Sequence, residues 1–148
     1  MRTYADASFL IALYRPDSFS ETATLYMARH SPSLILTLLQ IAEIRNSLRL
    51  QVARKLRSSD EVVQYLAIFE RDMAEDFFEA LAPQWETVFE NFEKISHRYT
   101  MREGHRFVDT LHVAMALSFK ASHFLTFDQR QARLAQAEGM KTPLALQG

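Results

Sequence analysis

The stretch "TYADASFLIAL" (residues 3–13) opens the chain and reads as a buried apolar strand that contains one carboxylate, Asp6. We predict a strand from Tyr4 to Tyr14, ended by the break "RPDS" at residues 15–18. Aspartate is depleted in strands and is almost never fully buried without a partner. Asp6 therefore needs an explanation, either a structural hydrogen bond or a chemical role.

Short apolar segments alternate with amphipathic ones along the rest of the chain. Further strands are predicted at "LILTLL" (residues 34–39), "DFFEAL" (76–81) and "SHFLTF" (122–127), with a possible edge strand at "MKTPLAL" (140–146). Helices are predicted over residues 20–29 and 40–57, from a capping start at 58–61, and over 85–99, 107–119 and 129–138, with a loop at 101–105. For "DFFEAL", a helix continuing to Ala82 stays open. The alternation predicts βαβ units and a parallel sheet covered by helices.

Composition narrows the class of protein. The 148 residues, 48% hydrophobic and 24% charged, fit one globular domain over residues 1–148. The absence of cysteine excludes a disulfide framework and a thiolate metal site, and none of the three glycines lies in a phosphate-loop pattern. No apolar run approaches the roughly 20 residues that a membrane span needs. We expect a cytoplasmic protein that does not contact a membrane.

The charges are unevenly distributed, although the net charge is only -1. Between residues 45 and 57 there is no acid, and the bases are Arg45, Arg49, Arg54, Lys55 and Arg57. From Asp60 to Glu93 there are ten acids and one base, Arg71. Such runs are usually solvated helix faces, but a basic strip is also suited to holding a polyanion. Charge alone does not choose between the two readings.

Four carboxylates lie in surroundings that do not obviously explain them: Asp6, Glu43, Asp109 and Asp128. Asp6 follows the first apolar residues of strand one, and Asp128 directly follows "FLTF". Glu43 lies one turn into the helix after strand two, and Asp109 opens a helix that is apolar on nearly every side. Ligands bind such sheets beyond the carboxyl ends of the strands. We therefore expect three of the four acids at this rim and Asp109 within reach of it.

Each acid also has a purely structural interpretation. Asp128 would cap the helix that begins at Gln129, and the helix dipole would favour Asp109 in a first turn. Glu43 would pair with Arg45 or another base of the strip, whereas Asp6 has few obvious donors. Taken together, four neighbouring carboxylates would repel one another unless cations offset their charge.

Mg²⁺ and Mn²⁺ prefer oxygen ligands of this kind. A carboxylate-held metal pair beside a basic strip is equipped for phosphodiester hydrolysis, because one ion activates water and the other stabilises the leaving oxygen. Histidine offers a competing idea, because His97, His105, His112 and His123 cluster in the C-terminal half, but no HExxH or similar ligand spacing occurs. We expect His112, three residues after Asp109, to be a satisfied core or rim histidine rather than a metal ligand.

The segments "YADASFLIALY", "LLQIAEIRNSL", "RFVDTLHVAMAL" and "HFLTFDQRQARLAQAEGM" resemble, in this order, the PIN-domain family of metal-dependent ribonucleases. The resemblance is strongest to the VapC-type toxins of type II toxin–antitoxin systems and covers essentially the whole chain. It includes the nineteen-residue step from Asp109 to Asp128. It implies a three-layer α/β/α fold with a mostly parallel central sheet.

The resemblance also implies roles for individual residues. Asp6, Glu43, Asp109 and Asp128 match the acids that hold one or two Mg²⁺ or Mn²⁺ ions in the family and carry out the cleavage of RNA. Ser8 and Thr126 match hydroxyls that steady the acidic pocket, and Arg106 matches a frequent basic residue. A homodimer and a small antitoxin partner are implied as well. RNA contacts are expected from the basic strip, at Arg45, Arg49, Arg54 and Lys55.

Three hypotheses follow for the function. The first is a divalent-metal-dependent endoribonuclease, the toxin of a toxin–antitoxin pair. The second is a PIN nuclease of RNA processing or decay without an antitoxin, and the third is a non-enzymatic protein-interaction module whose acids pair with partner arginines. A phosphotransfer domain is disfavoured, because no second acid stands two residues after Asp6 and no lysine follows a late strand.

Overall fold

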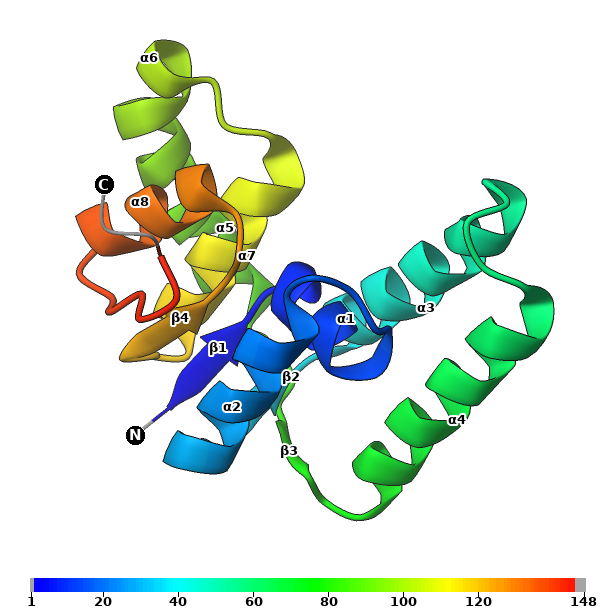
Figure 1. The fold of residues 1–148 in the computed structure, drawn as a ribbon. Helices are drawn as coiled ribbons and strands as arrows, with labels where there is room; N and C mark the ends of the chain where they lie inside the picture. Colours follow the sequence, from blue (N-terminus) through cyan, green and yellow to red (C-terminus); the bar gives the residue numbers. More distant parts are fainter. Residues whose placement is uncertain (1, 146–148) are drawn as a thin grey trace.

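The protein, seen in a computed structural model that describes residues 2–145, has a small parallel sheet between two sets of helices (Figure 1). The elements in chain order are β1 (Thr3–Ala5), α1 (Ala7–Tyr14), α2 (Ser20–His30), β2 (Leu34–Leu36), α3 (Leu38–Ala53), α4 (Ser59–Ala74), β3 (Phe78–Ala80), α5 (Trp85–Ile95), the π-helix η1 (Ser96–Thr100), α6 (Met101–Glu103), α7 (Phe107–Ser118), β4 (His123–Leu125) and α8 (Gln129–Ala137). The strands and helices alternate as the pattern predicts.

The sheet has the strand order β3-β2-β1-β4, and all neighbouring strands are parallel. Thr3 lies opposite Leu34 of β2 on one side and opposite His123 of β4 on the other. The chain therefore leaves β1 for β2 and β3 in one direction and returns to β4 in the other. The reversal of strand order next to β1 makes its carboxyl end the expected place of a ligand crevice.

Two apolar cores lie on the two faces of the sheet, because successive strand residues point to opposite sides. Tyr4 and Phe124 face the core formed with α5, α7 and α8. Ala5 and Leu125 face the core formed with α1, α3 and α4. Figure 1 shows α3 and α4 packed together and extending away from the sheet. The α/β/α arrangement that the sequence predicts is confirmed.

The predicted strand from Tyr4 to Tyr14 is wrong beyond Ala5. The chain turns at Asp6, whose side chain accepts a hydrogen bond from the backbone N–H of Phe9 and so caps α1. Most of α1 is buried, and a helix that is apolar all round shows no 3.6-residue period. The apolar run after Asp6 is therefore a helix that the sequence pattern does not distinguish from a strand.

Smaller differences lie at the boundaries of other elements. The strand in "LILTLL" ends at Leu36, because Thr37 caps α3 in a reciprocal capping box with Gln40. "DFFEAL" forms the strand β3, so the alternative helix to Ala82 is wrong there. Part of the predicted loop at 101–105 is helical, as α6.

In "MKTPLAL" the structure has one isolated bridge, between His123 and Lys141, and residue 146 lies outside the described residues. Within residues 2–145 no helix is long and apolar enough to cross a membrane.

Candidate active site

Asp6 lies directly after β1 and is only 6% exposed. Its carboxylate accepts hydrogen bonds from the hydroxyls of Ser8 and Thr126, at 2.7 and 2.8 Å, and from the backbone N–H of Phe9 at 3.1 Å. Burial raises the pKa of Asp6 above its ordinary value of 3.8, and these bonds with the nearby charge of His112 offset the rise only in part. Asp6 is thus a buried acid whose negative charge the protein compensates incompletely.

Thr126 joins the ends of β1 and β4. It follows β4, is buried, and its Oγ1 accepts a hydrogen bond from the backbone N–H of Asp128 at 3.0 Å. Two acceptors lie within reach of its hydroxyl hydrogen, Oδ2 of Asp6 at 2.8 Å and Oε1 of Gln131 at 3.0 Å. Ser8 makes a parallel link, because its Oγ accepts from the backbone N–H of Phe127 at 3.3 Å. The two predicted hydroxyls therefore tie Asp6 to the segment that carries Asp128.

Asp128 is the N-cap of α8. Its Oδ1 accepts from the backbone N–H groups of Arg130 and Gln131, at 2.9 and 3.2 Å, which is the structural role that the sequence allowed for it. The buried Gln131 side chain also donates through Nε2 to the carbonyl oxygen of Asp109 at 3.2 Å. Gln131 thus fixes the start of α7 against the start of α8.

Glu43 and Asp109 complete the set from two helices. Glu43, in α3, is hydrogen-bonded to Nε2 of His112, which lies in α7 one turn after Asp109. Asp109 lies in the first turn of α7, where its Oδ2 accepts from Nε of Arg106 at 3.1 Å. The alternative interpretation, in which Glu43 pairs with Arg45, does not hold, since Arg45 pairs with Glu70 of α4.

The four acids therefore lie in two hydrogen-bond networks near the carboxyl ends of β1 and β4. Thr126 and Gln131 join Asp6, Asp128 and the backbone carbonyl of Asp109, whereas Glu43 is joined to His112 and Tyr4. Among residues 2–145, one carboxylate oxygen each of Glu43, Asp109 and Asp128 has no hydrogen-bond partner. In the same described range no three acidic or histidine side chains converge closely enough to hold an ion as they stand. An all-carboxylate donor set around a buried, partly compensated charge nevertheless fits a hard divalent cation.

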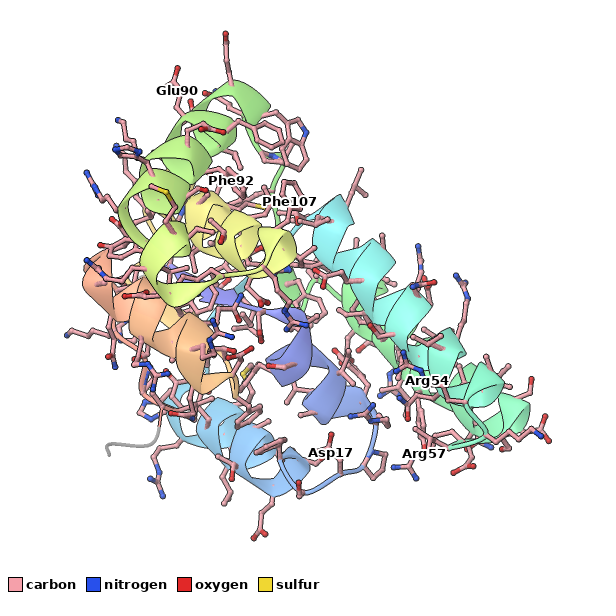
Figure 2. The ribbon with its side chains drawn as sticks, turned by 90° about the horizontal axis from the view of Figure 1, so that it is seen from above. Asp17, Arg54, Arg57, Glu90, Phe92 and Phe107 are labelled. Atoms are coloured by element: carbon pink, nitrogen blue, oxygen red, sulfur yellow. The ribbon has the colours of Figure 1, made fainter. Side chains whose placement is uncertain are left out.

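Most of the basic strip lies away from the four acids. Residues 43 and 54 are eleven positions apart on one helix, a rise of roughly 16 Å. Figure 2 shows Arg54 and Arg57 at the far end of the α3–α4 pair, distant from Phe107 at the start of α7. Arg106 lies outside the strip and pairs directly with Asp109, and its side chain is 80% exposed. The strip thus borders the site only at its Glu43 end.

Two residues of these networks, Gln131 and Tyr4, were not predicted from the sequence. Gln131 is polar and was passed over, although its spacing of three and four residues from Leu134 and Ala135 places it on the buried face of α8. Tyr4, whose hydroxyl is hydrogen-bonded to His112, reads as an ordinary core aromatic. The only signal for His112 was its spacing of three residues from Asp109, and the structure places it, as expected, as a satisfied buried histidine.

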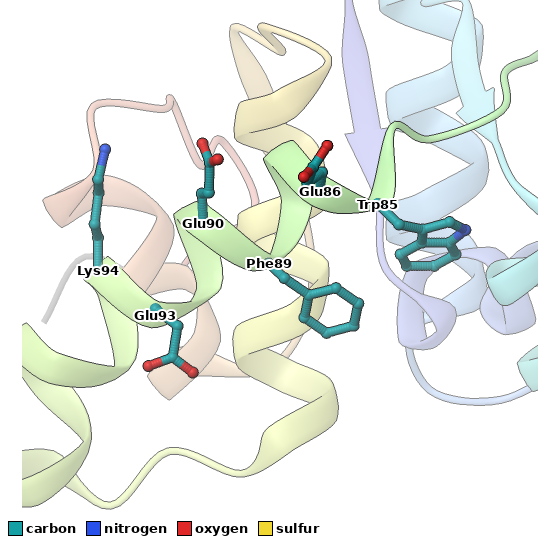
Figure 3. A pocket seen from close by; sticks show the side chains of 6 residues that line it. All are labelled: Trp85, Glu86, Phe89, Glu90, Glu93 and Lys94. Atoms are coloured by element: carbon teal, nitrogen blue, oxygen red, sulfur yellow. The ribbon is translucent and has the colours of Figure 1, made fainter.

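A separate apolar hollow lies on α5. Trp85 and Phe89 line it and point to the same side of the helix, with Glu86, Glu90, Glu93 and Lys94 around them (Figure 3). Phe107, at the start of α7, is also exposed and contacts Phe92 of α5 with ring centroids 5.1 Å apart. This surface contains none of the four acids.

Comparison with known proteins gives a family and a set of similar folds. The family model for the PIN domain matches residues 3–137. VapBC2 from Rickettsia felis, solved bound to a DNA fragment from their promoter, has a TM-score of 0.63 at 13% identity over 96% of this chain and 98% of that chain. VapC20 of Mycobacterium tuberculosis, a Sarcin-Ricin loop cleaving toxin, has 0.65 at 20% identity over 94% and 96%. FitAcB from Neisseria gonorrhoeae has 0.63 at 16% identity over 95% of each chain. No curated protein matches in sequence.

Proposed function

The chain belongs to the PIN-domain family, and from that premise we propose that it is a divalent-metal-dependent endoribonuclease, the toxin of a toxin–antitoxin pair. The observation that carries the proposal is Asp6, a buried carboxylate at the point where the strand order reverses, with its charge only partly offset. A buried acid with only a structural role is not stabilised by being ionised. An acid that holds a cation is, because the cation offsets its charge.

The residues of the site have distinct roles in this proposal. Asp6, Glu43, Asp109 and Asp128 hold Mg²⁺ or Mn²⁺, and the bound metal supplies activation of water and stabilisation of charge at the phosphate. The hydroxyls of Ser8 and Thr126 fix the orientation of the Asp6 carboxylate.

Arg106 is suited to approach the RNA backbone. Its guanidinium is mostly exposed even while Nε donates to Asp109, so its remaining donors are available to a phosphate. The exposed bases of α3 and of the turn that follows it, Arg49, Arg54 and Lys55, together with Arg45, are proposed to contact RNA farther from the cleaved bond.

Protein partners are part of the same proposal. We assign a homodimer contact to the exposed apolar side chains of α5 and the start of α7, namely Trp85, Phe89 and Phe107, because contiguous exposed apolar surface usually marks an interface. The similarity to VapBC2, VapC20 and FitAcB supports a small antitoxin as the second partner. We propose a single cytoplasmic domain for the whole of residues 1–148.

The test is RNA cleavage by the purified chain with Mg²⁺, with Mn²⁺ and with a chelator. Cleavage should require the metal, and Asp109→Asn should lower its rate by more than about 100-fold, since even residues that only orient metal ligands typically contribute 10–100-fold. Asp60→Asn is the matched control, because Asp60 is an exposed acid in the first turn of α4, remote from both networks. Cleavage that persists with the chelator, or that is equal in Asp109→Asn and Asp60→Asn, would disprove the mechanism.

A further inference from the structure

A chain of hydrogen bonds runs from the middle of the sheet to Glu43. The hydroxyl of Tyr4, in β1, is 2.6 Å from Nδ1 of His112 in α7, and Nε2 of the same ring is bonded to Oε1 of Glu43 in α3. Tyr4 is fully buried and His112 is 2% exposed, whereas the Glu43 side chain keeps 27% of its surface open. This series of hydrogen bonds therefore begins in the buried core, at Tyr4, and ends at the candidate site, at Glu43.

The direction of the hydrogen bonds follows from the acceptor at its end. A carboxylate can only accept, so Nε2 of His112 must carry a hydrogen and donate it to Glu43. With a neutral ring, Nδ1 is then an acceptor and the Tyr4 hydroxyl donates to it. With a charged ring, the hydroxyl accepts and its own hydrogen turns to Sδ of Met115, at 3.6 Å. In both states Tyr4 holds the ring so that Nε2 faces Glu43.

The surroundings of Tyr4 keep its hydroxyl in place. Its ring stacks on Phe124 with centroids 5.6 Å apart and an interplanar angle of 14°. Burial, and then the negative charges of Glu43 and Asp6, raise the pKa of Tyr4, so the phenol keeps its proton. A rigid, protonated phenol is a good support for an imidazole ring.

Glu43 needs such a support. It is a long side chain with several rotamers, and fixing it costs conformational entropy. Within residues 2–145 its hydrogen-bond partner is His112, since the nearby Arg45 is paired with Glu70. That bond occupies Oε1 and leaves Oε2 open. The histidine thus selects one orientation of the carboxylate in advance.

We infer that Tyr4 and His112 are positioning residues that orient Glu43 for a divalent cation, so that the Tyr4 hydroxyl sets the metal affinity through His112. This inference rests on the proposed metal-dependent function of the site. A purely structural reading asks only that the two buried polar groups satisfy each other. It gives no reason for a coupling to metal binding.

The experiment compares Tyr4→Phe with Tyr14→Phe by Mn²⁺ titration calorimetry and thermal unfolding. Tyr14 is the matched control, because it too is a buried tyrosine with a hydrogen-bonded hydroxyl, which donates to Asp72 of α4 at 2.8 Å rather than to His112. Both variants should lose similar stability. Tyr4→Phe should bind Mn²⁺ about 10-fold more weakly than wild type, the lower end for a group that orients a metal ligand, whereas Tyr14→Phe should bind it as wild type does.

A second step isolates the route through Glu43. In a Glu43→Ala background the added Tyr4→Phe change should leave the remaining Mn²⁺ affinity unaltered, because the side chain that it orients is gone. If the wild type binds Mn²⁺ and Tyr4→Phe binds it equally well, the inference is wrong and the proposed function stands. If the wild type binds no Mn²⁺, both are wrong.

Discussion

Asp6 and Asp128 stand at the ends of neighbouring parallel strands and perform the same local task, yet their surroundings differ. Each is an N-cap whose Oδ1 accepts from the backbone at the start of a helix, from one N–H group of α1 for Asp6 and from two of α8 for Asp128. Asp6 is buried and also receives two hydroxyl donors, whereas Asp128 is partly exposed and receives two backbone donors. Capping fully accounts for the environment of Asp128 but not for that of Asp6.

The energetics sharpen this difference. An N-cap contributes about 1 kcal/mol, and serine, threonine or asparagine would provide it as well as aspartate does. Burying a carboxylate costs several times more unless other groups offset the charge. Asp6 therefore has a charge that its structural role does not require, which is the reason to treat it as the anchor of a cation site.

Replacing Asp6 with asparagine should give the largest effect. Asparagine keeps an oxygen for the cap but removes the charge, so RNA cleavage should fall by more than about 100-fold, as for loss of a metal-holding group. The metal-free variant should be at least as stable as the wild type at neutral pH. RNA cleavage assays and urea unfolding check the two halves of this prediction.

The sign of the stability effect follows from the pKa of Asp6. Because burial raises that pKa above 3.8, the folded chain binds the proton more tightly than the unfolded chain does. In the metal-free wild type, the contribution of Asp6 to stability falls as pH rises from the unfolded to the folded pKa and stays low above it. Asp6→Asn has no such pH-dependent loss, so any excess of its unfolding free energy over that of the wild type should disappear at acid pH. A variant that is much less stable than wild type at neutral pH would make Asp6 a structural residue after all.

Removing the hydroxyl of Thr126, which joins Asp6 to the segment of Asp128, should give the next largest effect on metal affinity. Thr126→Val preserves shape but removes the donor to Asp6 and the acceptor for the backbone N–H of Asp128. Metal affinity should weaken about 10-fold, and raised metal concentration should restore much of the lost cleavage, because the metal-holding acids remain.

The chain offers a matched control for that variant. The Thr3 hydroxyl is buried, and no hydrogen-bond partner for it occurs within residues 2–145. Thr3→Val should leave metal affinity unchanged and should not lower stability, since an unsatisfied buried hydroxyl is a cost. Equal metal affinities for Thr126→Val and Thr3→Val would show that the hydroxyl between β1 and β4 does not orient Asp6.

The sequence predicted the α/β/α fold better than it predicted the local structure around Asp6. Alternating strands and helices predict parallel strands, and the carboxyl ends of parallel strands meet at one rim. The structure adds that β1 and β4 are neighbours, which brings the ends after Ala5 and Leu125 together. The apolar run after Asp6 remained ambiguous, because a helix buried on all sides lacks a period. The contact between Tyr4 and His112 joins residues 108 positions apart, and it depends on side-chain direction, which no local pattern contains. The roles of the four acids stay predictions.

Replacing Asp128 should give the smallest effect on stability and cleavage. Asp128→Ala removes both accepted hydrogen bonds at the start of α8, so it should lose about 1 kcal/mol of unfolding free energy, a shift of roughly 2–4 °C in Tm for a chain of this size. Asp128→Asn keeps an acceptor for the same N–H groups and should unfold close to the wild type. Because asparagine also keeps an oxygen for a cation at this partly exposed position, its loss of cleavage should be smaller than that of Asp6→Asn. Thermal unfolding and cleavage rates of the three variants decide the matter. An equal loss of cleavage in Asp6→Asn and Asp128→Asn would mean that the two acids contribute alike, and burial would then no longer single out Asp6 as the anchor.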